Sequence, residues 1–142
     1  YIESRRFDTR FFVVLAPDHQ EPLHDAVETT DSAWMTPDAI LERNAAGDLQ
    51  LAPPTLCTLR DLATFESAAD VLDFAQSHRP PTVLPHIEAD EGEVVLYLPG
   101  DEAYPADDPR YDVAEAAESD VTRLIMEKPG MWHTTQEPQV GT

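Results

Sequence analysis

Residues 5–16, RRFDTRFFVVLA, are the stretch that decides the fold. Taken as alternate residues, one side of this stretch is largely apolar, whereas the other is polar from Arg6 to Arg10 and then apolar at Phe12 and Val14. Successive side chains of a strand point to opposite faces, so this pattern fits the centre of a sheet, with one end buried and the other lining a cleft. The sequence therefore predicts a central β-strand over Arg5–Ala16.

Local signals place further elements after this strand. Another extended segment is expected over Leu23–Trp34, followed by a helix over Pro37–Ala46 that Thr36 caps and Gly47 terminates. The remaining expected elements are a helix from Pro53, a helix capped by Ser67 that ends before Pro80, a strand over Glu93–Leu98, and a hairpin formed by Val121–Glu127 and Met131–Thr135.

This order of elements predicts an α+β (mixed α/β) fold, with a mixed sheet packed against helices. The chain has 142 residues, which is enough for one domain and too few for two of ordinary size. Residues 1–142 are expected to form a single domain or the C-terminal portion of one. Within it, residues 1–52 supply strands and the first helix, residues 53–80 a helical region, and residues 81–142 a tail of strands and loops.

The charge balance restricts the class of partner. Nine Lys and Arg against 28 Asp and Glu give a formal charge of −19, which argues against binding nucleic acid or an anionic membrane through a basic surface. No apolar run approaches the roughly 20 residues that cross a bilayer. The single cysteine, Cys57, has no partner for an internal disulfide and is expected to be a small core residue. We expect a soluble, cytoplasmic protein.

The polar side of residues 5–16 holds the first candidate site. Arg6, Asp8 and Arg10 project to the same side of the predicted strand, and Asp8 can orient both guanidinium groups through charge-assisted hydrogen bonds. Two arginines fixed on a strand suit a phosphate or a carboxylate. The same residue types also suit a salt-bridged strand edge with no ligand, and the two interpretations carry equal weight.

Glu28 is the second candidate. A carboxylate in the middle of an extended segment could serve as a metal ligand or general base if it faces a cleft. It could also be a solvated strand residue of a very acidic protein, and Asp25 and Asp31 lie on the same stretch.

Other conspicuous residues suggest no site. Trp34 and Trp132 are expected to pack, and Asp101–Ser119 is expected to be a surface loop or short helix without a calcium site. Four of the five histidines form neither HxxxH nor HExxH and are expected on the surface or in loops: His24, His78, His86 and His133.

Three quoted stretches, together with Glu28, resemble a known family. RRFDTRFF at residues 5–12, DSAWMTPDAIL at 31–41 and GDLQLAPPTLCTLRDLA at 47–63 are together similar to the part of a Nudix hydrolase that follows the Nudix box. The similarity is to the coenzyme A diphosphatase-like branch and covers about the first half of the chain. The part after Pro80 is similar only through LPGD at residues 98–101 and a closing hairpin with a tryptophan.

The glutamate-rich Nudix box itself, with its REUxEE core (U is an aliphatic residue), has no match in the sequence. In the family the box precedes the segment that resembles residues 5–12. The resemblance therefore implies that this chain is the C-terminal portion of a longer polypeptide, and a degenerate relative that never hydrolyses a substrate is the alternative.

The resemblance also implies an activity. It implies a hydrolase, dependent on magnesium or manganese, that uses metal-activated water to cleave a phosphoanhydride bond in a nucleotide-linked metabolite such as coenzyme A or acyl-coenzyme A. Arg6 and Arg10 would contact phosphate, Asp8 would orient them, and Glu28 would act as a catalytic carboxylate outside the box. This chain alone would be inactive, with the missing N-terminal segment or a homodimer partner completing the site. The alternative is a non-catalytic Nudix-like domain that binds a ligand or a protein.

Overall fold

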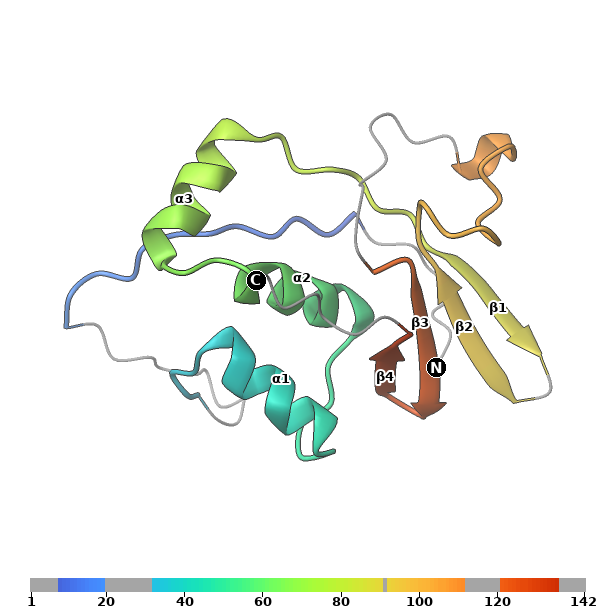
Figure 1. Ribbon diagram of the computed structural model, residues 1–142, viewed down its shortest axis with the longest axis horizontal. Coiled ribbons are helices and arrows are strands. Elements are labelled where there is room, and N and C mark those ends of the chain that lie inside the picture. The colour runs from blue at the N-terminus through green and yellow to red at the C-terminus, as the bar shows by residue number, and fades with distance from the viewer. Residues whose placement is uncertain (1–7, 20–31, 91, 112–120, 136–142) are drawn as a thin grey trace.

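The computed structural model describes residues 8–19, 32–90, 92–111 and 121–135. In this part of the chain, three α-helices precede a four-stranded sheet (Figure 1). The predicted α+β class is confirmed. The helices are α1 (Pro37–Ala45), α2 (Pro53–Ala63) and α3 (Ala68–Ser77), the strands are β1 (His86–Asp90), β2 (Glu93–Tyr97), β3 (Arg123–Lys128) and β4 (Met131–Thr134), and a short 3-10 helix covers Pro109–Tyr111.

The first helix starts and stops where local signals predict. The Thr36 hydroxyl oxygen accepts a hydrogen bond from the Ala39 N–H at 3.3 Å, and Pro37 is the first helical residue. Just after the helix, Gly47 takes a φ of 81°, a left-handed conformation that side chains disfavour. Asn44, the buried polar residue of this helix, donates its side-chain N–H to the Leu49 carbonyl at 2.7 Å.

The next two helices are confirmed as well. Helix α2 begins at Pro53, and α3 begins after Ser67, whose side chain accepts a hydrogen bond from the Asp70 N–H at 3.2 Å. Helix α3 ends at Ser77, shortly before Pro80. None of the helices described here has both the length and the apolar character that crossing a bilayer requires.

The sheet has the strand order β1-β2-β3-β4. Strand β2 and the β3–β4 hairpin are as predicted, whereas β1 was not predicted. Its sequence, HIEAD, is poor in the β-branched and aromatic residues that favour strands, and its pairing with β2 keeps it in the sheet. Every strand pair described is antiparallel, although a mixed sheet was expected.

The pairing register gives the sheet two different faces. On the core face, Ile87, Leu96 and Leu124 lie opposite one another on β1, β2 and β3. On the outer face, residues of the opposite parity are neighbours, among them His86, Tyr97 and Arg123 (β1, β2 and β3).

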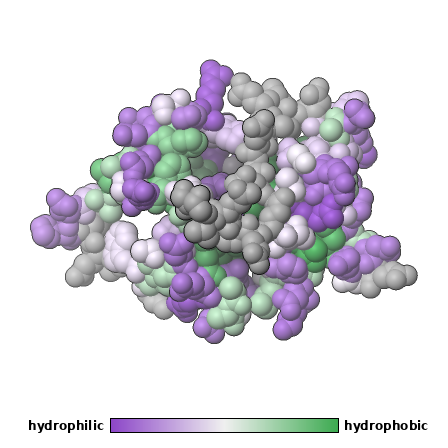
Figure 2. Space-filling view, viewed as in Figure 1, coloured by the Kyte–Doolittle hydropathy of each residue, from purple (hydrophilic) through white to green (hydrophobic). Residues whose placement is uncertain are grey.

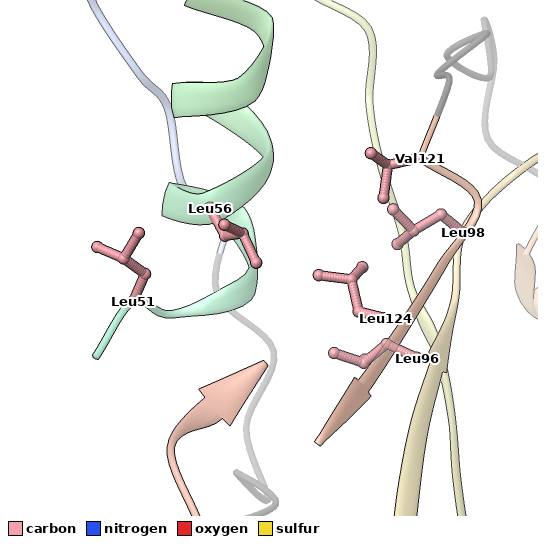
Figure 3. Packing of buried hydrophobic residues seen from close by; sticks show 6 residues of the cluster. All are labelled: Leu51, Leu56, Leu96, Leu98, Val121 and Leu124. Carbon is pink, nitrogen blue, oxygen red and sulfur yellow. The ribbon is translucent and has the colours of Figure 1, made fainter. Parts of the chain in front are cut away.

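The core lies between the core face and the start of α2. Leu56 points toward four apolar residues of the sheet and its flanks, and Leu51 belongs to the same buried cluster (Figure 3). These four are Leu96, Leu98, Val121 and Leu124. Leu124 is fully buried, with an exposed fraction of 0%. Cys57 and Trp132 pack against this cluster, which confirms the packing predicted for both.

The central strand predicted over Arg5–Ala16 is wrong for the residues that the structure describes. Residues 8–16 run beside no strand of the described sheet, and Phe12 and Val14 are 86% and 83% exposed. Residues 5–7 lie outside the described part. Apolar side chains on both faces indicate a segment that needs cover on both sides, and the described residues do not provide that cover.

The second predicted extended segment gives a similar result. Residues 23–31 of Leu23–Trp34 lie outside the described part, and residues 32–34 are not in a strand. Trp34 was expected to pack but is 69% exposed, so this prediction is wrong.

The buried position of Leu124 yields a stability prediction. Leu124→Ala should lower the free energy of unfolding by about 2–5 kcal/mol, because it removes apolar contacts and leaves a cavity. Urea denaturation followed by circular dichroism measures the change. Val83→Ala is the control: Val83 is 46% exposed, and its truncation should change stability by no more than about 0.5 kcal/mol. Equal losses in the two variants would contradict the position assigned to the core.

Candidate functional site

The residues predicted to carry chemistry are only partly described. Arg6 and Glu28 lie outside the described residues. The Arg10 guanidinium lies 3.8 Å from the Asp8 carboxylate, and their side chains are 76% and 86% exposed. An ion pair this exposed contributes little to stability. The roles predicted for all four residues in binding or catalysis stay predictions.

A polar network covers the outer face of the sheet. The Arg123 guanidinium lies over the Tyr97 ring, 5.0 Å from its centroid, and the rings of Tyr97 and His86 are 6.0 Å apart. Figure 2 shows hydrophilic side chains in the region of β1 and β2, next to a hydrophobic patch. Burial raises the pKa of the Tyr97 hydroxyl, and the nearby Glu88 carboxylate raises it further.

Asp101 connects this network to the acidic loop that follows β2. Its carboxylate accepts two hydrogen bonds from Arg123, at 3.0 and 2.7 Å, and one from the Ala103 N–H at 2.9 Å. The Asp101 side chain is only 5% exposed, and the Arg123 hydrogen bonds lower the pKa of its carboxyl group. The start of the loop is thereby held on β3.

Two buried tyrosines hold the rest of the described loop. The Tyr104 hydroxyl donates to the Leu84 carbonyl at 2.8 Å, and the Tyr111 hydroxyl lies 2.8 Å from His86 Nδ1. His86 Nε2 lies 3.2 Å from the Glu88 carboxylate. With a neutral ring, this arrangement fits Nε2–H donating to Glu88 while Nδ1 accepts from Tyr111. These contacts fasten the 3-10 helix to β1.

These contacts correct part of the sequence interpretation. His86 is a half-buried strand residue, so its expected place on the surface or in a loop is wrong. His78 and His133 are exposed as predicted, and His24 lies outside the described part. The predicted short helix in the acidic stretch is confirmed at Pro109–Tyr111, while residues 112–120 lie outside the described part. The Arg123–Asp101 and His86–Tyr111 contacts join residues that are 22 and 25 positions apart in the sequence, and no sequence pattern indicated them.

The core face of the sheet holds a hollow of a different character. This apolar hollow has a volume of about 460 Å³ and lies between the sheet and the segment that leads into α2. Its size falls in the range of about 300–1,000 Å³ that is usual for small-molecule pockets. Its lining consists of Gln50, Leu51, Ala52, Pro53, Pro54, Pro85, Ile87, Val94, Leu96, Met126, Gly130 and Trp132.

Neither a metal centre nor an activated thiol is found in the described part. Within residues 8–19, 32–90, 92–111 and 121–135, no group of three or more His, Cys, Asp or Glu side chains could hold a metal ion. These residues therefore do not fit the magnesium or manganese that the family resemblance implies. Burial, with a smaller contribution from Asp61, raises the pKa of the Cys57 thiol to about 11, so the thiol stays protonated at neutral pH.

The Asp101–Arg123 pair gives a pH prediction. Asp101→Asn should lower the free energy of unfolding by about 1–3 kcal/mol near pH 7, because a nearly buried charged hydrogen bond is lost. The folded-state pKa of Asp101 is lowered. The difference from wild type should therefore be complete above the unfolded aspartate pKa of about 3.9 and vanish as the pH falls through the lowered value. Urea unfolding at pH 7, 5 and 3 measures it.

Glu102→Gln is the matched control for this pair. Glu102 lies 3.9 Å from the same Arg123 guanidinium, but its side chain is 93% exposed, so its loss should cost clearly less. A difference between Asp101→Asn and wild type that stays constant with pH would contradict the role of the Asp101 charge.

Comparison with known proteins gives no match to a family model or to a solved structure. Curated proteins do match. The chain is 30% identical over 109 residues to the acyl-coenzyme A diphosphatase NUDT19 of Xenopus laevis, and 31% identical to those of Homo sapiens and Gallus gallus over 104 and 119 residues. These alignments cover 75%, 71% and 76% of this chain but only 29%, 28% and 29% of the relatives. The chain thus spans less than a third of each relative, and its predicted resemblance to the coenzyme A diphosphatase branch of the Nudix hydrolases is confirmed.

Proposed function

We propose that this chain forms part of a Nudix-type diphosphatase that hydrolyses a phosphoanhydride bond in a nucleotide-linked metabolite, with coenzyme A or an acyl-coenzyme A as substrate. The observation that carries the proposal is the similarity to three acyl-coenzyme A diphosphatases over about three quarters of the chain. The alignments cover at most 29% of each relative, so we assign the activity to the polypeptide in which this chain lies. The chain by itself is expected to be inactive.

Charge explains why the arginines of residues 5–16 matter in this proposal. A diphosphate is an anion, and a chain with a formal charge of −19 repels it at long range. Local cationic groups have to overcome this repulsion where the substrate binds. Arg6 and Arg10 would neutralise phosphate oxygens, and Asp8, which already lies beside Arg10, would orient the guanidinium groups.

Magnesium or manganese belongs to the proposal, with ligands beyond the described residues. Glu28 is the candidate carboxylate of this chain. The remaining ligands would come from residues outside the chain, because no REUxEE motif occurs in it.

The first test of this function concerns Arg10. In the full-length polypeptide, Arg10→Ala should lower kcat/KM for coenzyme A about tenfold to 150-fold, which corresponds to losing a charged hydrogen bond of about 1.5–3 kcal/mol. Chromatography of the two phosphomonoester products, with magnesium present, measures the rate. Arg79→Ala, at an exposed arginine after α3, should leave the rate unchanged.

Two other outcomes would contradict parts of the proposal. Wild-type kinetics in Arg10→Ala would show that residues 5–10 are only a salt-bridged edge. Hydrolysis undetectable in the full-length wild-type polypeptide would contradict the enzyme and favour the non-catalytic ligand-binding domain.

The second test concerns Glu28. Glu28→Gln removes a negative charge while keeping size, so the magnesium concentration that gives half the maximal rate should rise at least tenfold, or kcat should fall by a similar factor. Activity measured across a magnesium titration shows either effect. Asp31→Asn, on the same predicted segment, is the matched control. Equal responses of the two variants would remove Glu28 from the site.

A further inference from the structure

We propose that the apolar hollow binds the acyl chain of an acyl-coenzyme A. This inference rests on the proposed function and adds a binding site to it. The hollow lies on the core face of the sheet, away from the outer-face network.

The composition of the lining selects hydrocarbon over any charged ligand. None of the lining residues is charged, although charged residues make up 26% of the chain. A phosphate or a carboxylate placed there would lose its hydration without a compensating partner from the lining. An alkyl chain loses nothing by leaving water and gains contacts with the aliphatic, proline and aromatic groups around it.

The hollow has a buried floor and an exposed rim. Leu51, Val94 and Leu96 are buried and form the floor. Ile87, at 41% exposure, and Gln50 lie at the rim, so a chain can enter from solvent. The Gln50 amide can donate a hydrogen bond to the carbonyl oxygen at the head of an acyl chain, which would keep that polar end outside.

The backbone around the hollow makes it a better site for a small molecule than for another protein strand. Ile87, Val94 and Met126 belong to three strands whose backbone groups pair with one another. An occupant that lies on this face of the sheet therefore needs to supply only apolar contact. Met126 has a flexible thioether side chain that can adjust to chains of different length.

The dependence of affinity on chain length follows from the size of the hollow. Each methylene group that is fully buried should strengthen binding by about fourfold. The gain should stop when the hollow is full, because further methylene groups then stay in water.

The experiment measures this dependence by isothermal titration calorimetry. The full-length polypeptide is titrated with acetyl-, octanoyl- and dodecanoyl-coenzyme A below their micellar concentrations, in EDTA, with the integrity of each ligand checked by chromatography. We expect dodecanoyl-coenzyme A to bind at least tenfold more tightly than acetyl-coenzyme A. Ile87→Asp places a charge at the rim and should abolish this difference.

Two further variants control for folding and for general surface effects. Val83→Asp introduces the same charge at an exposed apolar residue that does not line the hollow, and it should keep the full chain-length dependence. Ala52→Trp fills the rim without adding a charge and should also abolish the dependence of affinity on chain length. It therefore tests the proposal independently if Ile87→Asp fails to fold.

Three outcomes would overturn the proposal. The first is equal affinity for all three ligands, and the second is an equal loss of chain-length dependence in Ile87→Asp and Val83→Asp. The third is that substitutions in the hollow change self-association, measured by sedimentation, and leave acyl binding unchanged. The last would make this face an interface between copies. Chain-length dependence without hydrolysis of coenzyme A would refute only the proposed function, and hydrolysis without chain-length dependence would refute only this inference.

Discussion

The burial of Leu124 and its neighbours between the sheet and α2 is the constraint on which the rest of the described structure depends. It determines which face of each strand points inward, because side chains alternate along a strand. Once Leu96 and Leu124 face α2, Tyr97 and Arg123 have to face outward. A shift of one residue in the β2–β3 pairing would expose the core and bury the guanidinium, so the register is strongly specified.

Helix ends were predictable from the sequence because their signals are local. Thr36, Pro37 and Ser67 act within one turn of their own positions, and the structure shows the expected capping hydrogen bonds at Thr36 and Ser67. Residues 5–16 were not predictable in this way. Their pattern shows which side chains need burial, but it carries no information on what covers them. The outer-face network was missed for a related reason, since Asp101 and Arg123 meet only when β2 and β3 pair.

The described arginines show how an acidic chain uses its few cations. Arg123 is bonded to Asp101, and Arg110 to Asp108, whose pKa it lowers to about 2. Both guanidinium groups are thus engaged by carboxylates that hold the loop after β2. To bind Arg123 or Arg110, an anionic substrate would have to displace the aspartate that is already bonded to that arginine. Other cationic groups are therefore better suited to bind the substrate.

Two exposed apolar surfaces in the described part of the chain differ in the kind of partner that would cover them. Residues 11–15 form an extended run that belongs to no strand of the described sheet, and a segment of that kind calls for backbone pairing as well as apolar cover. The apolar hollow lies on one face of strands that pair with one another, and an occupant of a sheet face supplies apolar cover alone. A flexible hydrocarbon satisfies the second requirement and fails the first. The same physical distinction explains why we assign a small apolar ligand to the hollow and assign none to residues 11–15.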